Sequence, residues 1–172
     1  MGRPGAHQAA YEALLRRYSA PLQRLARAYT RSSAERDDLF QDIALALWTA
    51  LPGFRGEASA RTWLYRVAHN TAIRFTTKRA RLCRHEQGDD APEAVSSANP
   101  ERSAIDDQQR QLLWDAVRLL PLTDREIVIL HLEGLSTTDI KDVTGLSAAN
   151  VATRLTRIRK KLIKAISGEE RR

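Results

Sequence analysis

The sequence predicts an all-α protein made of two small helical domains joined by a flexible acidic linker. Apolar residues recur every three or four positions through most of residues 7–82 and 104–162, which is the period of an amphipathic helix. Nowhere does the chain alternate apolar and polar residues as a half-buried strand does. Between the two regions the periodicity stops, and Gly, Pro, Ser, Asn and acidic residues accumulate. We expect domains over residues 1–82 and 108–172, with the linker over residues 83–107.

Three helices are predicted in the first domain. The first spans residues 7–29 and is expected to kink or break near Pro21, because proline removes an internal hydrogen bond. The second begins after Ser32 or Ser33, either of which can cap it, and stops at Pro52. Its first turns carry clustered acids. The helix macrodipole explains these acids by itself, and a docking face for a basic partner explains them equally well.

The third helix is predicted from Ala60 into the low 80s, and it carries two distinct faces. The expected inner side comprises Trp63, Leu64, Val67, Ala68 and Thr71. The opposite stripe, spaced by four, comprises Arg66, Asn70, Arg74 and Lys78, with Arg61, Arg79 and Arg81 nearby and Trp63 and Phe75 interleaved. This stripe is interpreted either as a solvated basic face or as a nucleic-acid track, in which an amide hydrogen-bonds a base edge and aromatic rings stack on an exposed base.

The second domain is predicted to hold four helices. Helical order resumes around Ala104 and runs to Leu120. Thr123 and Glu126 are expected to form a capping box for the next helix, which leads to Gly134. The last two helices then form a helix-turn-helix.

The helix-turn-helix is predicted over residues 134–161. Ser136 can cap its first helix together with Asp139, Gly145 supplies the left-handed turn, and Ser147 can cap its second helix. The apolar stripe of that second helix comprises Val151, Leu155, Ile158 and Leu162. The residues largely outside the stripe are Asn150, Thr153, Arg154, Arg157, Lys160 and Lys161. A helix that reads a DNA major groove needs this division between a buried and a basic side.

The net charge of +7 is unevenly distributed along the chain. Residues 1–82 hold 14 basic and 6 acidic side chains, residues 83–107 hold 2 and 7, and residues 108–172 hold 12 and 8. Two basic modules therefore flank an acidic connector. Basic modules favour polyanions because phosphates release counterions on binding, although solubility alone also accounts for such charge.

No convincing catalytic or metal-binding set is present, so the sequence predicts neither an enzyme nor a cofactor. The four histidines lie in separate segments without ligand spacing, and the lone cysteine, Cys83, excludes an internal disulfide. Asp37, Asp38 and Asp42 lack the carbonyl ligands of a cation site. No apolar run approaches the roughly 20 residues of a membrane span, and the N-terminus lacks a signal-peptide core. We therefore expect a cytoplasmic protein without membrane insertion.

Three stretches, in this order, resemble the sigma factors of the sigma-70 type, and among them the small two-domain extracytoplasmic-function (ECF) class. The core-polymerase-binding helix of region two resembles residues 36–48, RDDLFQDIALALW. The promoter-melting segment resembles residues 54–75, FRGEASARTWLYRVAHNTAIRF. Region four resembles residues 120–162, LPLTDREIVILHLEGLSTTDIKDVTGLSAANVATRLTRIRKKL. The resemblance implies a protein that directs core RNA polymerase to promoters by recognising minus-ten and minus-35 elements.

The resemblance also implies roles for individual residues. Core-polymerase binding is implied for Asp38, Leu39, Gln41, Asp42 and Trp48. Minus-ten DNA binding is implied for Phe54, Arg55, Arg61, Trp63, Arg66, Asn70, Arg74 and Lys78, the loop 54–61 capturing a flipped base that Asn70 helps to read. Minus-35 DNA binding is implied for Ala149, Asn150, Ala152, Thr153, Arg154, Thr156 and Arg157. The implied partners are the beta-prime clamp helices and beta flap of core RNA polymerase, promoter DNA and an anti-sigma factor.

Two positions depart from the family pattern, and two alternatives stay open. Lys141 stands where a small alanine is usual, which can alter packing inside the motif, and Ala152 replaces a frequent Lys or Arg, which removes a DNA contact. One alternative is a two-domain helix-turn-helix regulator that is not a sigma factor, which would need strands in its first domain. The other is a sigma-like protein that binds only polymerase or an anti-sigma factor, and the basic stripe weighs against it.

Overall fold

The computed structural model describes residues 4–85 and 104–166, and this part of the chain contains helices and turns but no strand. The helices fall into two compact units, α1–α3 and α4–α7. The predicted linker lies largely outside the described residues. Helix α3 reaches three residues into it, to His85, because no glycine or proline interrupts the chain before Gly88. In the described residues no helix combines the length and apolarity needed to cross a bilayer.

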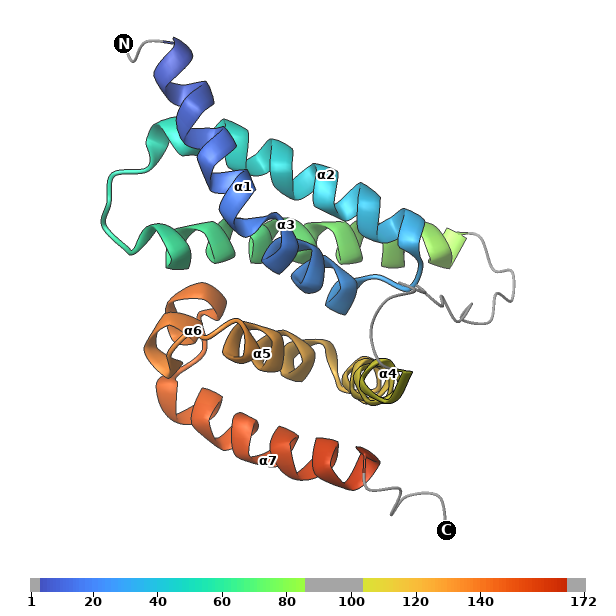
Figure 1. Ribbon diagram of the computed structural model, residues 1–172. Coiled ribbons are helices and arrows are strands. Elements are labelled where there is room, and N and C mark those ends of the chain that lie inside the picture. The colour runs from blue at the N-terminus through green and yellow to red at the C-terminus, as the bar shows by residue number, and fades with distance from the viewer. Residues whose placement is uncertain (1–3, 86–103, 167–172) are drawn as a thin grey trace. The chain divides into compact units, whose positions relative to one another are not determined.

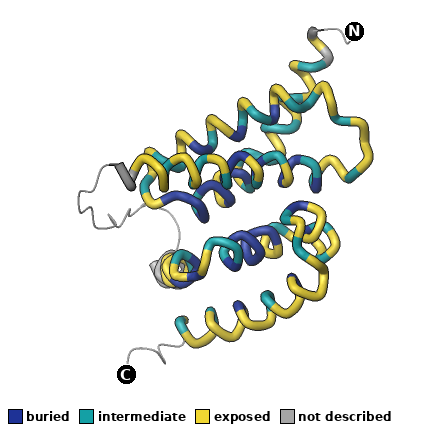
Figure 2. The backbone as a smooth tube through the Cα atoms, turned by 180° about the vertical axis from the view of Figure 1, so that it is seen from behind, coloured by how far each residue is buried: buried dark blue, intermediate teal, exposed yellow. Residues whose placement is uncertain are grey.

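The first unit consists of α1 (Pro4–Tyr29), α2 (Ser33–Ala50), a short 3-10 turn (Leu51–Gly53) and α3 (Ala60–His85) (Figure 1). Helix α2 packs against both α1 and α3. Their shared core is made of the fully buried side chains of Leu22, Leu25, Leu39, Ile43, Leu47, Leu64 and Tyr65. Figure 2 shows the buried positions gathered where the helices face one another.

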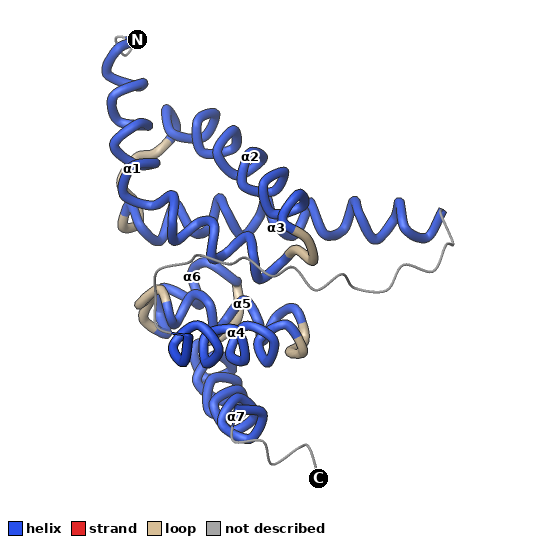
Figure 3. The backbone as a smooth tube through the Cα atoms, turned by 45° about the vertical axis from the view of Figure 1, so that its right-hand side comes forward, coloured by secondary structure: helices blue, strands red, loops and turns tan. Residues whose placement is uncertain are grey.

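The ends of these helices follow local side-chain chemistry. Of the two alternatives expected near Pro21, a break is excluded because helix α1 is continuous across this residue. A kink agrees with the ribbon of α1, which changes direction partway along (Figure 1). Ser32 caps α2, its Oγ accepting a hydrogen bond of 3.2 Å from the Glu35 backbone N–H. Ser59 plays the same part for α3 by accepting from the Thr62 N–H at 3.0 Å. The last turns of α3 extend past α2 in the view of Figure 3.

The second unit consists of α4 (Ala104–Arg118), α5 (Leu122–Leu132), α6 (Thr137–Thr144) and α7 (Ala148–Ile166). Helices α4 and α5 both pack against α7. The buried apolar side chains include Val117, Ile127, Ile129, Leu130, Ile140, Val151 and Ile158. Four helices ending in a helix-turn-helix are as predicted, and helical order resumes at Ala104 as expected.

The turn chemistry of the second unit is partly as predicted. Ser136 and Asp139 form the expected capping box, and Gly145 ends α6 in the left-handed conformation, at φ +75°. The capping box expected at Thr123 is wrong, because α5 begins at Leu122 behind Pro121, without a side-chain cap. Lys141 is exposed, so its side chain lies outside the buried core of the unit.

Replacing Gly145 by alanine should destabilise the protein by about 1–2 kcal/mol, because an L side chain is strained in a left-handed backbone. A Cβ at this position meets no atom within 4 Å, so the cost comes from backbone strain rather than a clash. Urea unfolding followed by circular dichroism measures it. Gly145→Asn should recover part of the loss, because asparagine tolerates this conformation. An alanine variant as stable as the parent would contradict the assignment of the turn.

Candidate nucleic-acid and partner-binding surfaces

The acidic side of α2 faces solvent. Asp38, Gln41 and Asp42 are exposed. The buried side of the helix is formed instead by Leu39, Ile43 and Leu47, which recur every four positions. Leu39 belongs to that inner side and has no exposed surface. In this structure Leu39 packs the helix in place and has no exposed atom, and its predicted contact with polymerase stays a prediction.

Trp48 lies near the C-terminal end of α2. Trp48 is 38% exposed, and its ring meets the rings of His7 and Tyr11 edge-on, with centroids 4.1 and 5.0 Å away. The Tyr11 hydroxyl donates a hydrogen bond of 3.0 Å to the backbone oxygen of Ala44. Burial raises the pKa of Tyr11, so this hydroxyl keeps its proton at neutral pH. Trp48 is thus partly exposed, and its ring is held in place by its contacts with His7 and Tyr11.

Helices α2 and α3 border a groove of about 650 Å³. The side chains that line it are the acids Glu35, Asp38 and Asp42, the basic Arg74, Lys78 and Arg79, the apolar Leu45, Ala46, Phe75 and Leu82, and Thr71. Glu35 and Arg79 join the two helices through an ion pair. The structure therefore places two acids predicted to bind polymerase in the same groove as two basic residues predicted to bind DNA. No sequence pattern predicted the apolar part of this groove, where Leu45 and Leu82 are 64% and 55% exposed.

The predicted basic stripe lies on the outer side of α3. Arg66, Asn70, Arg74 and Lys78 are all exposed. This follows from helical geometry, because Leu64, Ala68 and Ala72, again four apart, are fully buried. Tyr65 is buried as well, which the predicted inner side did not include.

A polar hollow of about 380 Å³ lies beside the start of α3. Its lining is Gly53, Phe54, Arg55, Glu57, Ala58, Trp63 and Arg66. The rings of Phe54 and Trp63 stack at 4.9 Å with a tilt of 41°. Four residues of the predicted minus-ten set therefore share this hollow, whereas Arg61 is half-buried and does not line it. The stripe is thus divided, with Arg66 at the hollow and Arg74 and Lys78 at the groove.

The predicted minus-35 residues lie on α7, and all but one are exposed. The exposed ones are Ala149, Asn150, Ala152, Thr153, Thr156 and Arg157, whereas Arg154 is half-buried. The hydroxyls of Thr153 and Thr156 donate to backbone oxygens one turn earlier, at 2.9 and 3.1 Å. Their hydroxyl protons are therefore already used, and their oxygens remain as acceptors.

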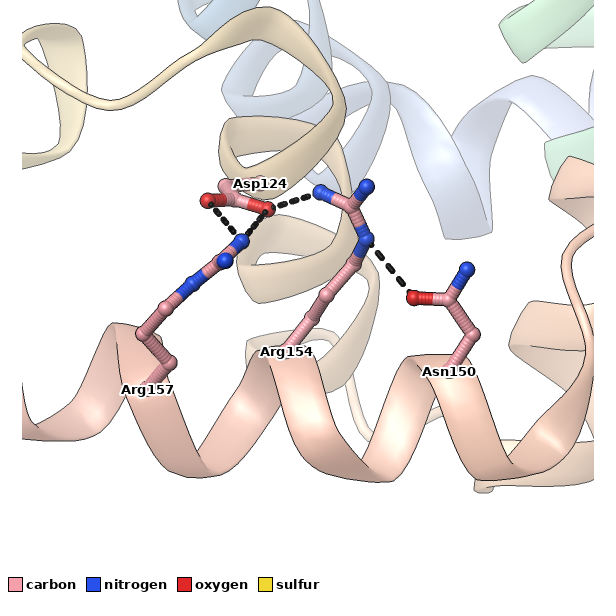
Figure 4. A network of polar contacts seen from close by, with 4 residues as sticks. All are labelled: Asp124, Asn150, Arg154 and Arg157. Carbon is pink, nitrogen blue, oxygen red and sulfur yellow. Dashed lines mark hydrogen bonds and ion pairs between the residues drawn. The ribbon is translucent and has the colours of Figure 1, made fainter.

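Asp124 holds α7 to the start of α5. Its side chain has no exposed surface and sits in the first turn of α5, where the helix dipole favours a negative charge. Arg154 Nη1 donates to Asp124 Oδ1 at 2.5 Å, and Arg157 Nη2 donates to Oδ2 at 3.1 Å (Figure 4). Arg154 Nε also donates to Asn150 Oδ1 at 2.9 Å. Asp124 was not predictable from sequence as a partner of α7, because the helix dipole alone explains an acid early in a helix.

Metal-ligand geometry is not found in the described ranges, where no three His, Cys, Asp or Glu side chains come together. The arrangement suits binding. It offers an acidic helix face, a basic stripe that ends at an aromatic hollow, and a helix-turn-helix with a polar outer side.

Two family models match the chain, Sigma-70 region 2 over residues 14–82 and Sigma-70, region 4 over residues 110–162. The RNA polymerase sigma-H factor of Pseudomonas aeruginosa is 29% identical over 168 residues, which cover 91% of this chain and 86% of that protein. The ECF RNA polymerase sigma-E factor of Escherichia coli is 30% identical over 163 residues, covering 88% and 84%.

Two solved structures share the fold. The sigma factor RpoE, in complex with the anti-sigma factor NepR from Bartonella quintana, has a TM-score of 0.78 at 21% identity, covering 92% of this chain and 97% of that one. CnrH, in complex with the cytosolic domain of CnrY, has a TM-score of 0.66 at 24% identity, covering 94% and 90%.

Truncation of the neighbouring residues Leu39 and Asp38 should change the free energy of unfolding by very different amounts. Leu39→Ala should lower the free energy of unfolding by about 3 kcal/mol, because it removes a fully buried side chain and leaves a cavity. Asp38→Ala should change it by less than about 0.5 kcal/mol, because its side chain lies in solvent. Denaturant unfolding of the two variants tests this, and equal losses would show that the described orientation of α2 is incorrect.

Proposed function

Because the chain belongs to the ECF class of the sigma-70 family of RNA polymerase sigma factors, we propose that it binds core RNA polymerase and directs it to promoters through the surfaces described above. One observation carries the assignment of surfaces. The exposed acids of α2 and the exposed basic stripe of α3 occupy a single helical unit, and the helix-turn-helix occupies the other. A promoter-directing subunit needs a contact for polymerase and separate contacts for two DNA elements, and this distribution supplies them.

The polymerase contact is assigned to the exposed side of α2. Asp38, Gln41 and Asp42 offer carboxylates and an amide to a basic partner, and Trp48 adds a partly exposed ring of the kind that anchors protein interfaces. We assign these residues to the beta-prime clamp helices. The beta flap is proposed as a further contact of the same enzyme.

The minus-ten contact is assigned to the hollow at Phe54 and Trp63 together with the start of the stripe. Aromatic walls can hold a base that has left the duplex, and Arg66 brings a positive charge to the same hollow. Asn70 lies one turn further along α3 and can hydrogen-bond a base edge. The outer side of α7 is assigned to the minus-35 element, since the second helix of such a motif enters the major groove.

The remaining assignments concern regulation, location and chemistry. Both structural relatives were solved with a protein partner, NepR in one case and the cytosolic domain of CnrY in the other. We extend this to an anti-sigma factor for the present chain. Its place of action is the cytoplasm, where the polymerase works, and its role is binding rather than catalysis.

Reconstitution with core polymerase separates the two surfaces of the first unit. Asn70→Ala should reduce open-complex formation about ten-fold and change core binding less than two-fold, because it removes a base contact alone. The double variant Asp38→Ala, Asp42→Ala should weaken core binding about five-fold through loss of two exposed charges. Fluorescence polarisation measures core binding, and permanganate footprinting measures melting.

Asp37→Ala is the matched control for the acidic pair, because Asp37 is an exposed acid on the same helix outside the groove and outside the predicted set. It should leave core binding unchanged. Equal loss of core binding and melting in Asn70→Ala would show that Asn70 is structural. A wild-type protein that binds core but starts no transcription would support an interaction protein, and one that does not bind core would refute the proposed function.

A further inference from the structure

Starting from the proposed function, we infer that Asp124 and Arg154 orient the side-chain amide of Asn150, so that α7 turns its NH₂ group rather than its oxygen toward DNA at this position. The helix would therefore read a hydrogen-bond acceptor on a base edge of the minus-35 element. Asp124 and Arg154 act as positioning residues, and Asn150 is the residue that meets the base.

A continuous chain of hydrogen bonds connects the interior to the outer side of α7 (Figure 4). It begins at Asp124, which is fully buried, passes through Arg154 Nη1 at 2.5 Å, and continues from Arg154 Nε to Asn150 Oδ1 at 2.9 Å. Arg154 is only 29% exposed, so its guanidinium is held between the two partners. The orientation of an exposed amide is thereby tied to a carboxylate without access to solvent.

The chemistry of the guanidinium decides which amide atom faces it. Arginine carries donors only, so the atom of Asn150 that receives the bond must be the oxygen. Within the described ranges no hydrogen bond engages Asn150 Nδ2, and the side chain is exposed. The NH₂ group is therefore the part of the amide left for a ligand.

The position of Asn150 suits a base contact. Its backbone N–H is capped by Ser147 Oγ at 3.2 Å, which places it in the first turn of α7, and recognition helices contact base edges with their N-terminal residues. An unrestrained asparagine reads adenine with its oxygen and nitrogen together. With its oxygen turned toward Arg154, Asn150 meets an approaching base with its NH₂ group, which donates to an acceptor such as a purine N7, guanine O6 or thymine O4.

The test is selection of minus-35 sequences by the full-length protein assembled with core polymerase, on promoters with a fixed minus-ten element and a randomised upstream segment. The wild type should favour a base with an acceptor at one position, by about five-fold, as a single hydrogen bond allows. Asn150→Ala should lose that preference and keep the others. Asn150→Asp replaces the NH₂ donor by an acceptor, so the preference should move to cytosine, whose major-groove edge offers an amino group and no acceptor.

Arg154→Met tests positioning, because methionine keeps much of the side chain and removes the hydrogen bonds. It should relax the preference at the Asn150-dependent base pair and raise the share of adenine there, because the bidentate contact with adenine uses the amide oxygen and nitrogen together. Arg157→Met is the matched control, because Arg157 also binds Asp124 but makes no bond to Asn150. It should lower affinity for all sequences about equally. Unfolding curves of both variants show whether each remains folded.

Three results would overturn the inference. The first is an Asn150→Ala variant that keeps every base preference. The second is a folded Arg154→Met variant with an unchanged preference at the Asn150-dependent base pair. The third is a wild-type preference for adenine that disappears when its N6 amino group is removed, because that contact requires the amide oxygen. Failure of the proposed function differs from all three, since no minus-35 sequence would then be enriched by the wild type.

Discussion

Helical periodicity is the constraint on which both units depend. Burying a large apolar side chain stabilises the fold by about 1.5–3 kcal/mol, so a helix with several such residues on one side has a single favourable rotation about its axis. In α3 the buried stripe that includes Leu64 and Ala68 fixes this rotation, and Arg66 and Asn70 are then directed to solvent. Residues that never touch the core are thus oriented by those that form it.

The same constraint gives the basic stripe an uneven electrostatic character. Arg74 and Lys78 share their groove with the acids of α2, whose negative charges oppose attraction of a phosphate. Arg66 lies instead in the hollow with Phe54 and Trp63, where Glu57 is the acid in the lining. The N-terminal half of the stripe is therefore better suited to DNA, and the C-terminal half can also serve a protein partner that complements both signs of charge. Residues at equal spacing on one helix thus differ in their suitability for DNA, because the charges around them differ.

The features that were predictable from sequence are those set by local spacing. The capping box at Ser136, the left-handed turn at Gly145 and the exposed stripe each depend on residues within a few positions of one another. The contact between Asp124 and Arg154 joins positions 30 residues apart, and the groove joins side chains of two helices, so neither follows from periodicity. Leu39 shows a different limit, because a matching motif position does not distinguish a side chain that contacts a partner from one that packs the contacting helix.

Asp124 forms ion pairs with two arginines of α7, Arg154 and Arg157, whose surroundings differ. A buried carboxylate that loses all its partners is strongly destabilising, so Asp124 must keep at least one cation. Arg154 is the more enclosed of the two and bonds Asn150 as well, whereas Arg157 is 54% exposed and makes no such second bond. Arg157 can therefore exchange its carboxylate for a DNA phosphate while Arg154 still neutralises Asp124. In the proposed arrangement, Arg157 is thus available to a DNA phosphate, and Arg154 holds Asn150 in place.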